Sequence, residues 1–394
     1  MRIAIVSDYF LDYVGGAQTS MLQQRLALIQ AGHQVSLISA TRNPGRRFQV
    51  SAEGLRIRPL FTLPGVELPV IPNNKATTDA LETYFTELGI EVVHVQTEFG
   101  LAHAATEVAR RLGLRVVHTV HTFYWASDGG WHAPLAPVLR SALGRFTRSA
   151  IPKLRFTPRP VDNLLRNVTL GMALTADAVV SPSAHQAADL EAAGVPAPIA
   201  VVPNPIAASP RQPVPLTTEL AARPAFLWVA RCEGVKRPLV FAEAAIRALE
   251  RTGNAFSVDF VGDGYELAAL RRMTADHPNI RVHGALPHEK VLDLMDSAAA
   301  VVLTSLGFDN QPMTIAEAVS RERGVLYCDP KLTEGLGQAG FLTGTPDADG
   351  LADALVTLAG EPSRLIELSQ GAARDHALFS AETYVTGILA VYGD

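Results

Sequence analysis

Two carboxylates, Asp309 and Glu317, flank a proline that can begin a helix. The apolar run 300–305 just before them predicts a buried strand, so both lie where a strand gives way to a helix. Unpaired N–H groups and the positive end of the helix dipole suit a diphosphate there. Asp309 could then hold sugar hydroxyls and Glu317 ribose hydroxyls. The residues between them complete a candidate site for this diphosphate ligand: Asn310, Gln311, Pro312, Met313 and Thr314.

Two cations, Arg231 and Lys236, follow another apolar run, 225–230. At the end of a strand both can converge on a diphosphate, and each charge-assisted hydrogen bond contributes about 1.5–3 kcal/mol. Gly262 and Gly264 follow the run 257–262 and predict a tight turn beside the same ligand. Each motif alone also fits an ordinary role, as a solvated basic loop, a surface carboxylate or a plain turn.

The first half of the chain has its own candidates. Gly15 and Gly16 follow the first apolar run, where missing side chains let a ligand approach backbone N–H groups. His121 lies just beyond the run 115–120, with Tyr124 close by, and could contact a reacting group. A structural histidine is the alternative for His121, and we interpret His94 and His118, inside runs, as structural.

Short apolar runs alternate with helical patterns throughout, which predicts βαβ units and parallel sheets covered on both faces. A proline-spaced stretch, 201–216, separates two such series. We therefore predict an α/β protein of two doubly wound, Rossmann-like domains, 1–205 and 206–379, with a C-terminal helix, 380–394, packing back on the first. Ligands of such sheets bind at the carboxyl ends of strands. The predicted strands are 2–7, 34–39, 91–96, 115–120, 225–230, 257–262, 280–284, 300–305 and 324–328.

Composition narrows the class of protein. The 394 residues are 48% hydrophobic and 19% charged, as in ordinary globular proteins. The two cysteines are far apart, so neither a disulfide framework nor a cysteine metal site is predicted. The N-terminus lacks a signal-peptide pattern, and no apolar run reaches the ~18–20 residues that span a bilayer. We expect a cytoplasmic protein that is soluble or peripheral on the inner face of the cell membrane.

Together these motifs resemble family-4 glycosyltransferases over essentially the whole chain. The order is that of the family: Gly15/Gly16, His121, a Pro203-Asn204-Pro205 hinge, Arg231/Lys236, Gly262/Gly264 and an acidic pair. The resemblance implies the GT-B fold, with an acceptor-binding first domain and a second domain that binds a UDP- or GDP-sugar, facing one another across a cleft. It also implies retention of anomeric configuration, with catalytic roles for His121, Arg231, Lys236 and Asp309, and no metal requirement.

The stretches HVQTEFG (94–100) and HTFYW (121–125) are similar to those of bacterial enzymes that glycosylate diacylglycerol-type lipids. In such enzymes a basic, partly apolar segment of the first domain contacts the anionic membrane. The matching segment here runs from Trp131 to Arg166, and the alternatives are a basic helix that faces solvent or a segment that faces the interdomain cleft. Its candidate membrane or acceptor residues are Tyr124, Trp131, Arg140, Arg145, Arg148, Lys153, Arg155 and Arg159.

Two positions depart from the family pattern. Asp309 replaces the usual glutamate and is one methylene shorter, and SRERGVLYCD (320–329) replaces a small-residue GxPVV form. Asp347-Ala348-Asp349, the one Asp-x-Asp motif, is interpreted as a turn.

Three alternatives remain open: a glycosyltransferase with a soluble or polysaccharide acceptor, a dinucleotide-dependent oxidoreductase and a non-catalytic nucleotide-sugar binding protein. The oxidoreductase is disfavoured because no G-x-G-x-x-G follows the first strand. The net charge of −5 disfavours nucleic-acid binding. The sequence does not indicate an oligomeric state.

Overall fold

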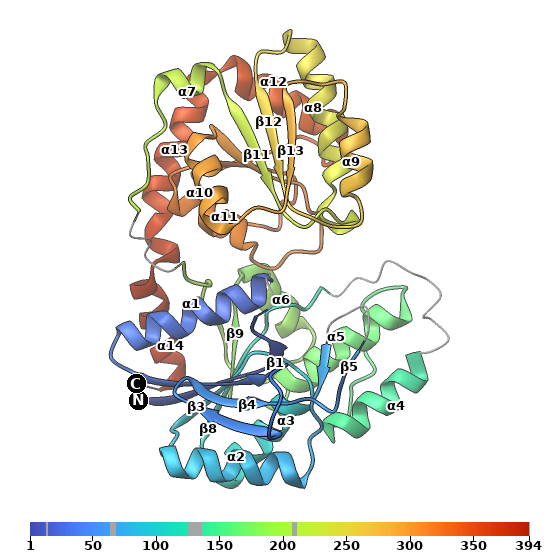
Figure 1. Ribbon diagram of the computed structural model, residues 1–394, viewed down its shortest axis with the longest axis vertical. Coiled ribbons are helices and arrows are strands. Elements are labelled where there is room, and N and C mark those ends of the chain that lie inside the picture. The colour runs from blue at the N-terminus through green and yellow to red at the C-terminus, as the bar shows by residue number, and fades with distance from the viewer. Residues whose placement is uncertain (13–14, 64–67, 125–135, 207–210, 394) are drawn as a thin grey trace. The chain divides into compact units, whose positions relative to one another are not determined.

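The computed structural model describes residues 1–394 except 13–14, 64–67, 125–135, 207–210 and 394. The chain divides into two compact units (Figure 1). Unit 1 comprises Met1–Ala207 and Ala381–Asp394, and unit 2 comprises Ala208–Ser380. Each unit is built on a largely parallel sheet with helices packed on it.

The sheet of unit 1 has the strand order β10-β9-β8-β7-β1-β2-β4-β3, parallel except for the β3–β4 pair. Its central strands are nearly continuous apolar runs because helices cover both faces. A separate antiparallel hairpin is formed by β5 and β6. The strands are β1 (Arg2–Phe10), β2 (Gln34–Ala40), β3 (Phe48–Ser51), β4 (Gly54–Ile57), β5 (Phe61–Leu63), β6 (Leu68–Val70), β7 (Val92–Val95), β8 (Arg115–Thr119), β9 (Ala178–Ser181) and β10 (Ile199–Val201).

The last helix of the chain, α14 (Ala381–Tyr392), belongs to unit 1 and packs against α1. It buries Tyr384, Ile388 and Tyr392 in the core beside β1 and β8. The other helices of the unit are α1 (Gly16–Gln30), α2 (Lys75–Leu88), α3 (Gly100–Arg111), α4 (Ala136–Thr147), α5 (Pro160–Ala173) and α6 (Ala184–Ala192).

The sheet of unit 2 has the order β13-β12-β11-β14-β15-β16 and is parallel throughout. Trp228, Phe226 and Phe260 fill its core against Phe241 of α8. The strands are β11 (Ala225–Val229), β12 (Ser257–Val261), β13 (Ile280–Gly284), β14 (Ala300–Leu303), β15 (Gly324–Tyr327) and β16 (Gly340–Leu342). The helices are α7 (Thr218–Ala222), α8 (Pro238–Thr252), α9 (Leu267–Met273), α10 (His288–Ser297), α11 (Met313–Ser320), α12 (Ala348–Gly360) and α13 (Pro362–Asp375), with 3-10 turns Gly234–Lys236 and His376–Phe379.

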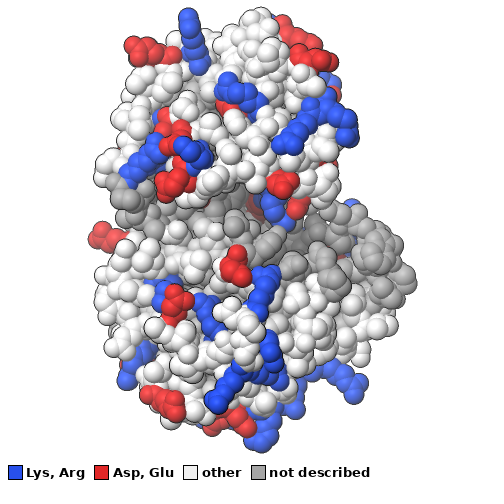
Figure 2. Space-filling model, in the orientation of Figure 1, with Lys and Arg blue, Asp and Glu red and all other residues white. Residues whose placement is uncertain are grey.

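The predicted fold class is confirmed, and each of the nine predicted strands corresponds to an observed strand within a few residues at its ends. Asp347, which we expected in a turn, caps α12, where its carboxylate accepts a hydrogen bond from the N–H of Gly350 at 2.9 Å. No helix among the described residues is long and apolar enough to cross a membrane. The visible face of each unit carries cations and anions side by side (Figure 2).

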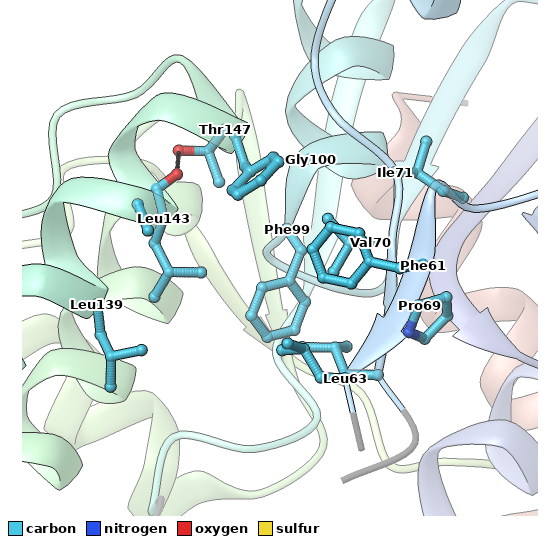
Figure 3. Close-up of a pocket in the computed structure, with 13 residues that line it drawn as sticks. Phe61, Leu63, Pro69, Val70, Ile71, Phe99, Gly100, Leu139, Leu143 and Thr147 are labelled. Carbon is cyan, nitrogen blue, oxygen red and sulfur yellow. Dashed lines mark hydrogen bonds between the residues drawn. The ribbon is translucent and has the colours of Figure 1, made fainter. Parts of the chain in front are cut away.

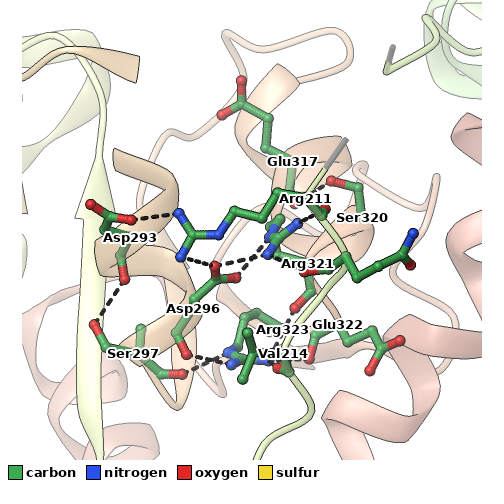
Figure 4. Close-up of polar contacts among 12 residues, drawn as sticks. Arg211, Val214, Asp293, Asp296, Ser297, Glu317, Ser320, Arg321, Glu322 and Arg323 are labelled. Atoms are coloured by element: carbon green, nitrogen blue, oxygen red, sulfur yellow. Dashed lines mark hydrogen bonds and ion pairs between the residues drawn. The ribbon is translucent and has the colours of Figure 1, made fainter. Parts of the chain in front are cut away.

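The unusual SRERG segment is explained by two buried arginines that hold the chain entering unit 2 (Figure 4). Arg321 forms a bidentate ion pair with Asp296, at 2.7 and 2.8 Å, and also donates to the carbonyls of Arg211 and Gln212. Arg323, fully buried, donates to the carbonyls of Val214 and Ala298. Small residues here would leave these carbonyls without their arginine donors and would leave the Asp296 carboxylate paired with Arg211 alone.

Candidate functional site

Most of the predicted donor residues lie at one edge of the unit 2 sheet, whereas Gly15 and Gly16, also predicted to bind the donor, lie in unit 1. Because β11, β12, β13 and β14 are parallel neighbours, the loops after them meet at their carboxyl ends. Those loops carry Arg231 and Lys236, then Gly262 and Gly264, then the start of α10, and finally Asp309 and the start of α11.

Lys236 and Asp309 are in direct contact at this edge. The Lys236 ammonium is paired with the Asp309 carboxylate, which also accepts a hydrogen bond from the Ser305 hydroxyl. The side chains are only 16% and 10% exposed, so water screens the pair weakly. Thr304 fixes the lysine loop, since its hydroxyl donates to the Lys236 carbonyl at 2.6 Å. The shorter aspartate is therefore held in place by a cation that an anionic ligand could share.

The glycine turn presses against the loop that carries Arg231. Gly262 has φ +142°, and a Cβ there would lie 1.8 Å from the carbonyl oxygen of Ala230. Gly264, with φ +154°, would bring a Cβ to 2.5 Å from the Cys232 carbonyl oxygen. Only glycine allows this close approach of two backbones. Arg231 itself is half-exposed and pairs with Glu233 at 2.9 Å.

Helix α11 begins beside the end of β11, where the Thr314 hydroxyl donates to the carbonyl of Val229 at 3.3 Å. Pro312 is its N-cap and Met313 its first residue, as the sequence predicts. Glu317 follows one turn later and contacts His288 of α10 at 3.2 Å. That hydrogen bond raises the pKa of His288. Asn310 and Gln311, just before the helix, are buried.

In unit 1, His121 is held by a chain of buried amides that sequence reasoning missed. His121 Nε2 lies 2.6 Å from Gln96 Oε1, and Gln96 Nε2 donates to Gln24 Oε1 at 2.8 Å. Gln24 Nε2 in turn donates to Asn204 Oδ1 at 3.0 Å, and the Tyr384 hydroxyl donates to Gln24. The available signals were the glutamine of HVQTEFG and the asparagine of the PNP motif.

This network fixes the protonation state of His121. Because the Gln96 amide nitrogen already donates to Gln24, its oxygen accepts the Nε2–H of His121, which leaves Nδ1 as the accepting nitrogen. Burial lowers the pKa of His121 to about 4, so the ring is neutral near pH 7. A neutral, oriented imidazole can accept a proton or a hydrogen bond from a ligand hydroxyl.

Gly15 and Gly16 follow β1 in unit 1, and the two histidines interpreted as structural, His94 and His118, lie within β7 and β8. Gly15 is the N-cap of α1 and Gly16 its first residue, following β1. His94 bonds Tyr392 and Thr119, at 2.7 and 2.6 Å. His118 is also fully buried, in β8.

Most cations of the predicted basic segment are exposed to solvent. Arg145, Arg148, Lys153, Arg155 and Arg159 are exposed. Arg140 is instead half-buried and donates to the carbonyls of Ile151 and Pro152. Trp131 lies outside the described residues.

A membrane contact for Tyr124 is wrong, because its ring is buried and stacks on His185 while its hydroxyl donates to Asp189 at 2.7 Å. An interior ring cannot touch a lipid surface. Among the described residues, no group of three or more His, Cys, Asp or Glu side chains could hold a metal ion.

Comparisons with known proteins agree with this architecture. Residues 14–209 match the family model described as Glycosyltransferase Family 4, and residues 223–361 match that of Glycosyl transferases group 1. An alpha-monoglucosyldiacylglycerol synthase of Streptococcus pneumoniae is 29% identical over 126 residues, 32% of this chain and 27% of that protein. The corresponding synthase of Acholeplasma laidlawii is 27% identical over 128 residues, 32% of this chain and 30% of that one. These matches thus span less than a third of each relative.

Solved structures share the fold over the full length. Sucrose-phosphate synthase from Thermosynechococcus elongatus superposes with a TM-score of 0.69 at 18% identity, covering 100% of this chain and 98% of that one. Anabaena HepE in complex with UDP-glucose gives a TM-score of 0.63 at 14% identity, covering 100% of both chains. With both halves matched by glycosyltransferase models and the GT-B fold shared, the chain belongs to glycosyltransferase family 4.

Proposed function

We propose that the chain is a retaining hexosyltransferase that moves a sugar from a nucleotide diphosphate to a hydroxyl of a membrane lipid such as diacylglycerol. The observation that carries the donor half is the gathering of Lys236, Asp309 and the start of α11 at the carboxyl edge of the unit 2 sheet. A cation and a helix N-terminus at one edge suit a pyrophosphate. Structural neighbours bound to UDP and UDP-glucose support a UDP-sugar as donor.

In the proposed reaction the acceptor hydroxyl attacks the anomeric carbon from the face that the leaving diphosphate occupies. The bond from that carbon to the phosphate oxygen breaks, and the same oxygen takes the acceptor proton, so configuration is retained without a protein nucleophile. Lys236, Arg231 and the N–H groups of α11 stabilise the charge that develops on the diphosphate. Asp309 holds sugar hydroxyls, and Glu317 holds the ribose. By the family resemblance, we infer that His121 contacts the transferred sugar.

The partial match to glucosyldiacylglycerol synthases supports a lipid acceptor. The exposed cations on α4 and in the segment after it also support one. We propose that the protein acts peripherally on an anionic membrane. By the family resemblance we expect turnover without an added metal ion.

Thermal shifts with UDP, GDP and their sugars identify the donor, and sugar transfer into anionic vesicles containing diacylglycerol tests the acceptor. Transfer only to soluble acceptors would refute the lipid half. Donor binding with no transfer to any acceptor would refute the enzyme half.

Lys236→Ala tests the donor site directly. Removing a preorganised charge at the leaving group should lower turnover about 10²–10³-fold. Arg364→Ala is the control, because Arg364 is an exposed cation of the same unit and lies in α13. Near-normal turnover in Lys236→Ala would contradict the assignment.

A further inference from the structure

An apolar pocket in unit 1 lies between the β5–β6 hairpin, the start of α3 and helix α4 (Figure 3). Its volume is about 120 Å³. The lining is almost entirely aliphatic and aromatic, and includes Phe61, Leu63, Val70, Phe99, Leu139 and Leu143. An apolar cavity of similar size, ~150 Å³, stays dry and takes up small apolar ligands. This pocket therefore favours a hydrocarbon over water.

The walls of the pocket are held together by contacts that its own lining residues make. The rings of Phe61 and Phe146 meet edge to face at 6.3 Å, which joins the hairpin to α4. The end of α4 is tied to the segment after β6, since Asn73 N–H donates to the Phe146 carbonyl at 2.8 Å and its amide donates to the Thr147 carbonyl at 3.2 Å. The pocket is thus formed before anything enters it.

The mouth of the pocket is apolar on both sides. Of the residues that line it, Phe61 on the hairpin is 46% exposed and Leu139 on α4 is 39% exposed. Large apolar side chains exposed together on two neighbouring elements mark an interaction surface. An occupant must therefore continue as an apolar body beyond the pocket.

The exposed charges on α4 and in the segment after it are all positive, which indicates the kind of molecule that could bind here. Arg145 lies on α4, and Arg148, Lys153 and Arg155 follow it, all exposed, while the sequence 136–161 contains no acidic residue. Such exposed cations are attracted to an anionic membrane surface. A hydrocarbon pocket with exposed cations on and after α4 complements a lipid with an anionic head, in the plane of a membrane.

We propose that this pocket takes the end of one acyl chain of an anionic membrane lipid, while Arg145, Arg148, Lys153 and Arg155 hold phosphate headgroups. The inference deepens the proposed function, since it rests on the enzyme working at a membrane. It assigns the β5–β6 hairpin and α4 as the two elements that enter the lipid surface.

Photocrosslinking tests the proposal. Phosphatidylglycerol carrying a diazirine at the end of one acyl chain is presented both in phosphatidylglycerol vesicles and, as a short-chain analogue, in monomeric form. We expect crosslinks to peptides covering 61–71 and 139–147. Crosslinks confined to other parts of the chain, or none with either form, would overturn the proposal.

Two matched pairs of variants sharpen this test. Ala142→Phe fills the pocket, and Ser141→Phe places the same side chain one residue away, outside the lining. Leu139→Asp puts a charge at the mouth, and Val138→Asp puts it on the neighbouring residue, which does not line the pocket. Leu139 is already exposed, so its variant should fold even if Ala142→Phe does not.

We expect each pocket variant to lower pocket crosslinking at least tenfold relative to its control, with sedimentation on anionic vesicles retained through the cations. Equal crosslinking within both pairs would refute the acyl site. Sugar transfer to lipid, measured in parallel, separates the two hypotheses. Transfer without pocket crosslinks refutes the pocket alone, and pocket crosslinks without transfer refute the proposed lipid acceptor alone.

Discussion

Replacing Arg321 by methionine should destabilise unit 2 strongly. The variant keeps an unbranched side chain but removes the bidentate partner of Asp296, in a pair whose side chains are 2% and 6% exposed. Breaking a buried pair by removing one partner costs about 3–5 kcal/mol, because the remaining charge stays buried. Arg211 also contacts Asp296, at 2.8 Å, which places the expected loss toward the lower end of that range.

The free energy of unfolding can be followed through Trp228, which is 1% exposed in the core of unit 2. The chain has three tryptophans, and Trp228 is the one that remains in a background with Trp125→Phe and Trp131→Phe. Urea titration of its fluorescence therefore reports on the unfolding of unit 2. Arg364→Met is the matched control, since its pair with Glu367 is 46% and 61% exposed and should contribute about 0–1 kcal/mol. A loss in Arg321→Met no larger than that of the control would refute the explanation of the SRERG segment.

Four further outcomes are expected. Gln96→Leu should lower turnover about 10²-fold with little change in donor affinity, because it releases His121 from its orientation, and steady-state kinetics would show this as a kcat effect. Burial lowers the pKa values of His94, His118 and His121 to about 3, 3 and 4. The stability that these neutral rings contribute above pH 6.5 should therefore be lost as the pH falls, by up to about 1.4 kcal/mol per pH unit for each ring. Urea titrations at pH 7 and pH 5 would measure this loss. Burial raises the pKa of Glu98 from 4.5 to about 8, so stability present below pH 4.5 should decline up to pH 8, and Glu98→Gln should gain stability over the parent at pH 8.5 relative to pH 5. Gly262→Ala should abolish the thermal shift given by UDP, whereas Gly360→Ala, with nothing within 4 Å of its added Cβ, should leave it unchanged.

The fold was predictable because buried parallel strands are encoded locally. The runs that became β11 and β14 are continuous apolar stretches, and the rule that ligands bind at strand ends predicts that Lys236 and Asp309 share one edge. Their mutual ion pair was not predictable, since it depends on how two loops close over Thr304.

Features built from distant residues could not be predicted from local patterns. The amides that orient His121 come from α1, the end of β7 and the segment before unit 2, and no local pattern joins Gln24 to Asn204. The β5–β6 hairpin was missed because its strands are three residues long and Pro69 interrupts their pattern, so the pocket it forms with α4 was missed too. The role of Arg321 was hidden for the same reason, since its partners are carbonyls whose positions only the folded chain defines.

Helix α14 has a consequence for synthesis. Tyr384 and Tyr392 complete the core of unit 1, yet they are made after all of unit 2. On the ribosome, unit 2 can therefore reach its native state while unit 1 still waits for its final helix. A fragment ending at Ala207 should expose the apolar groove that α14 fills and aggregate, whereas residues 208–380 should be expressible as an independent domain.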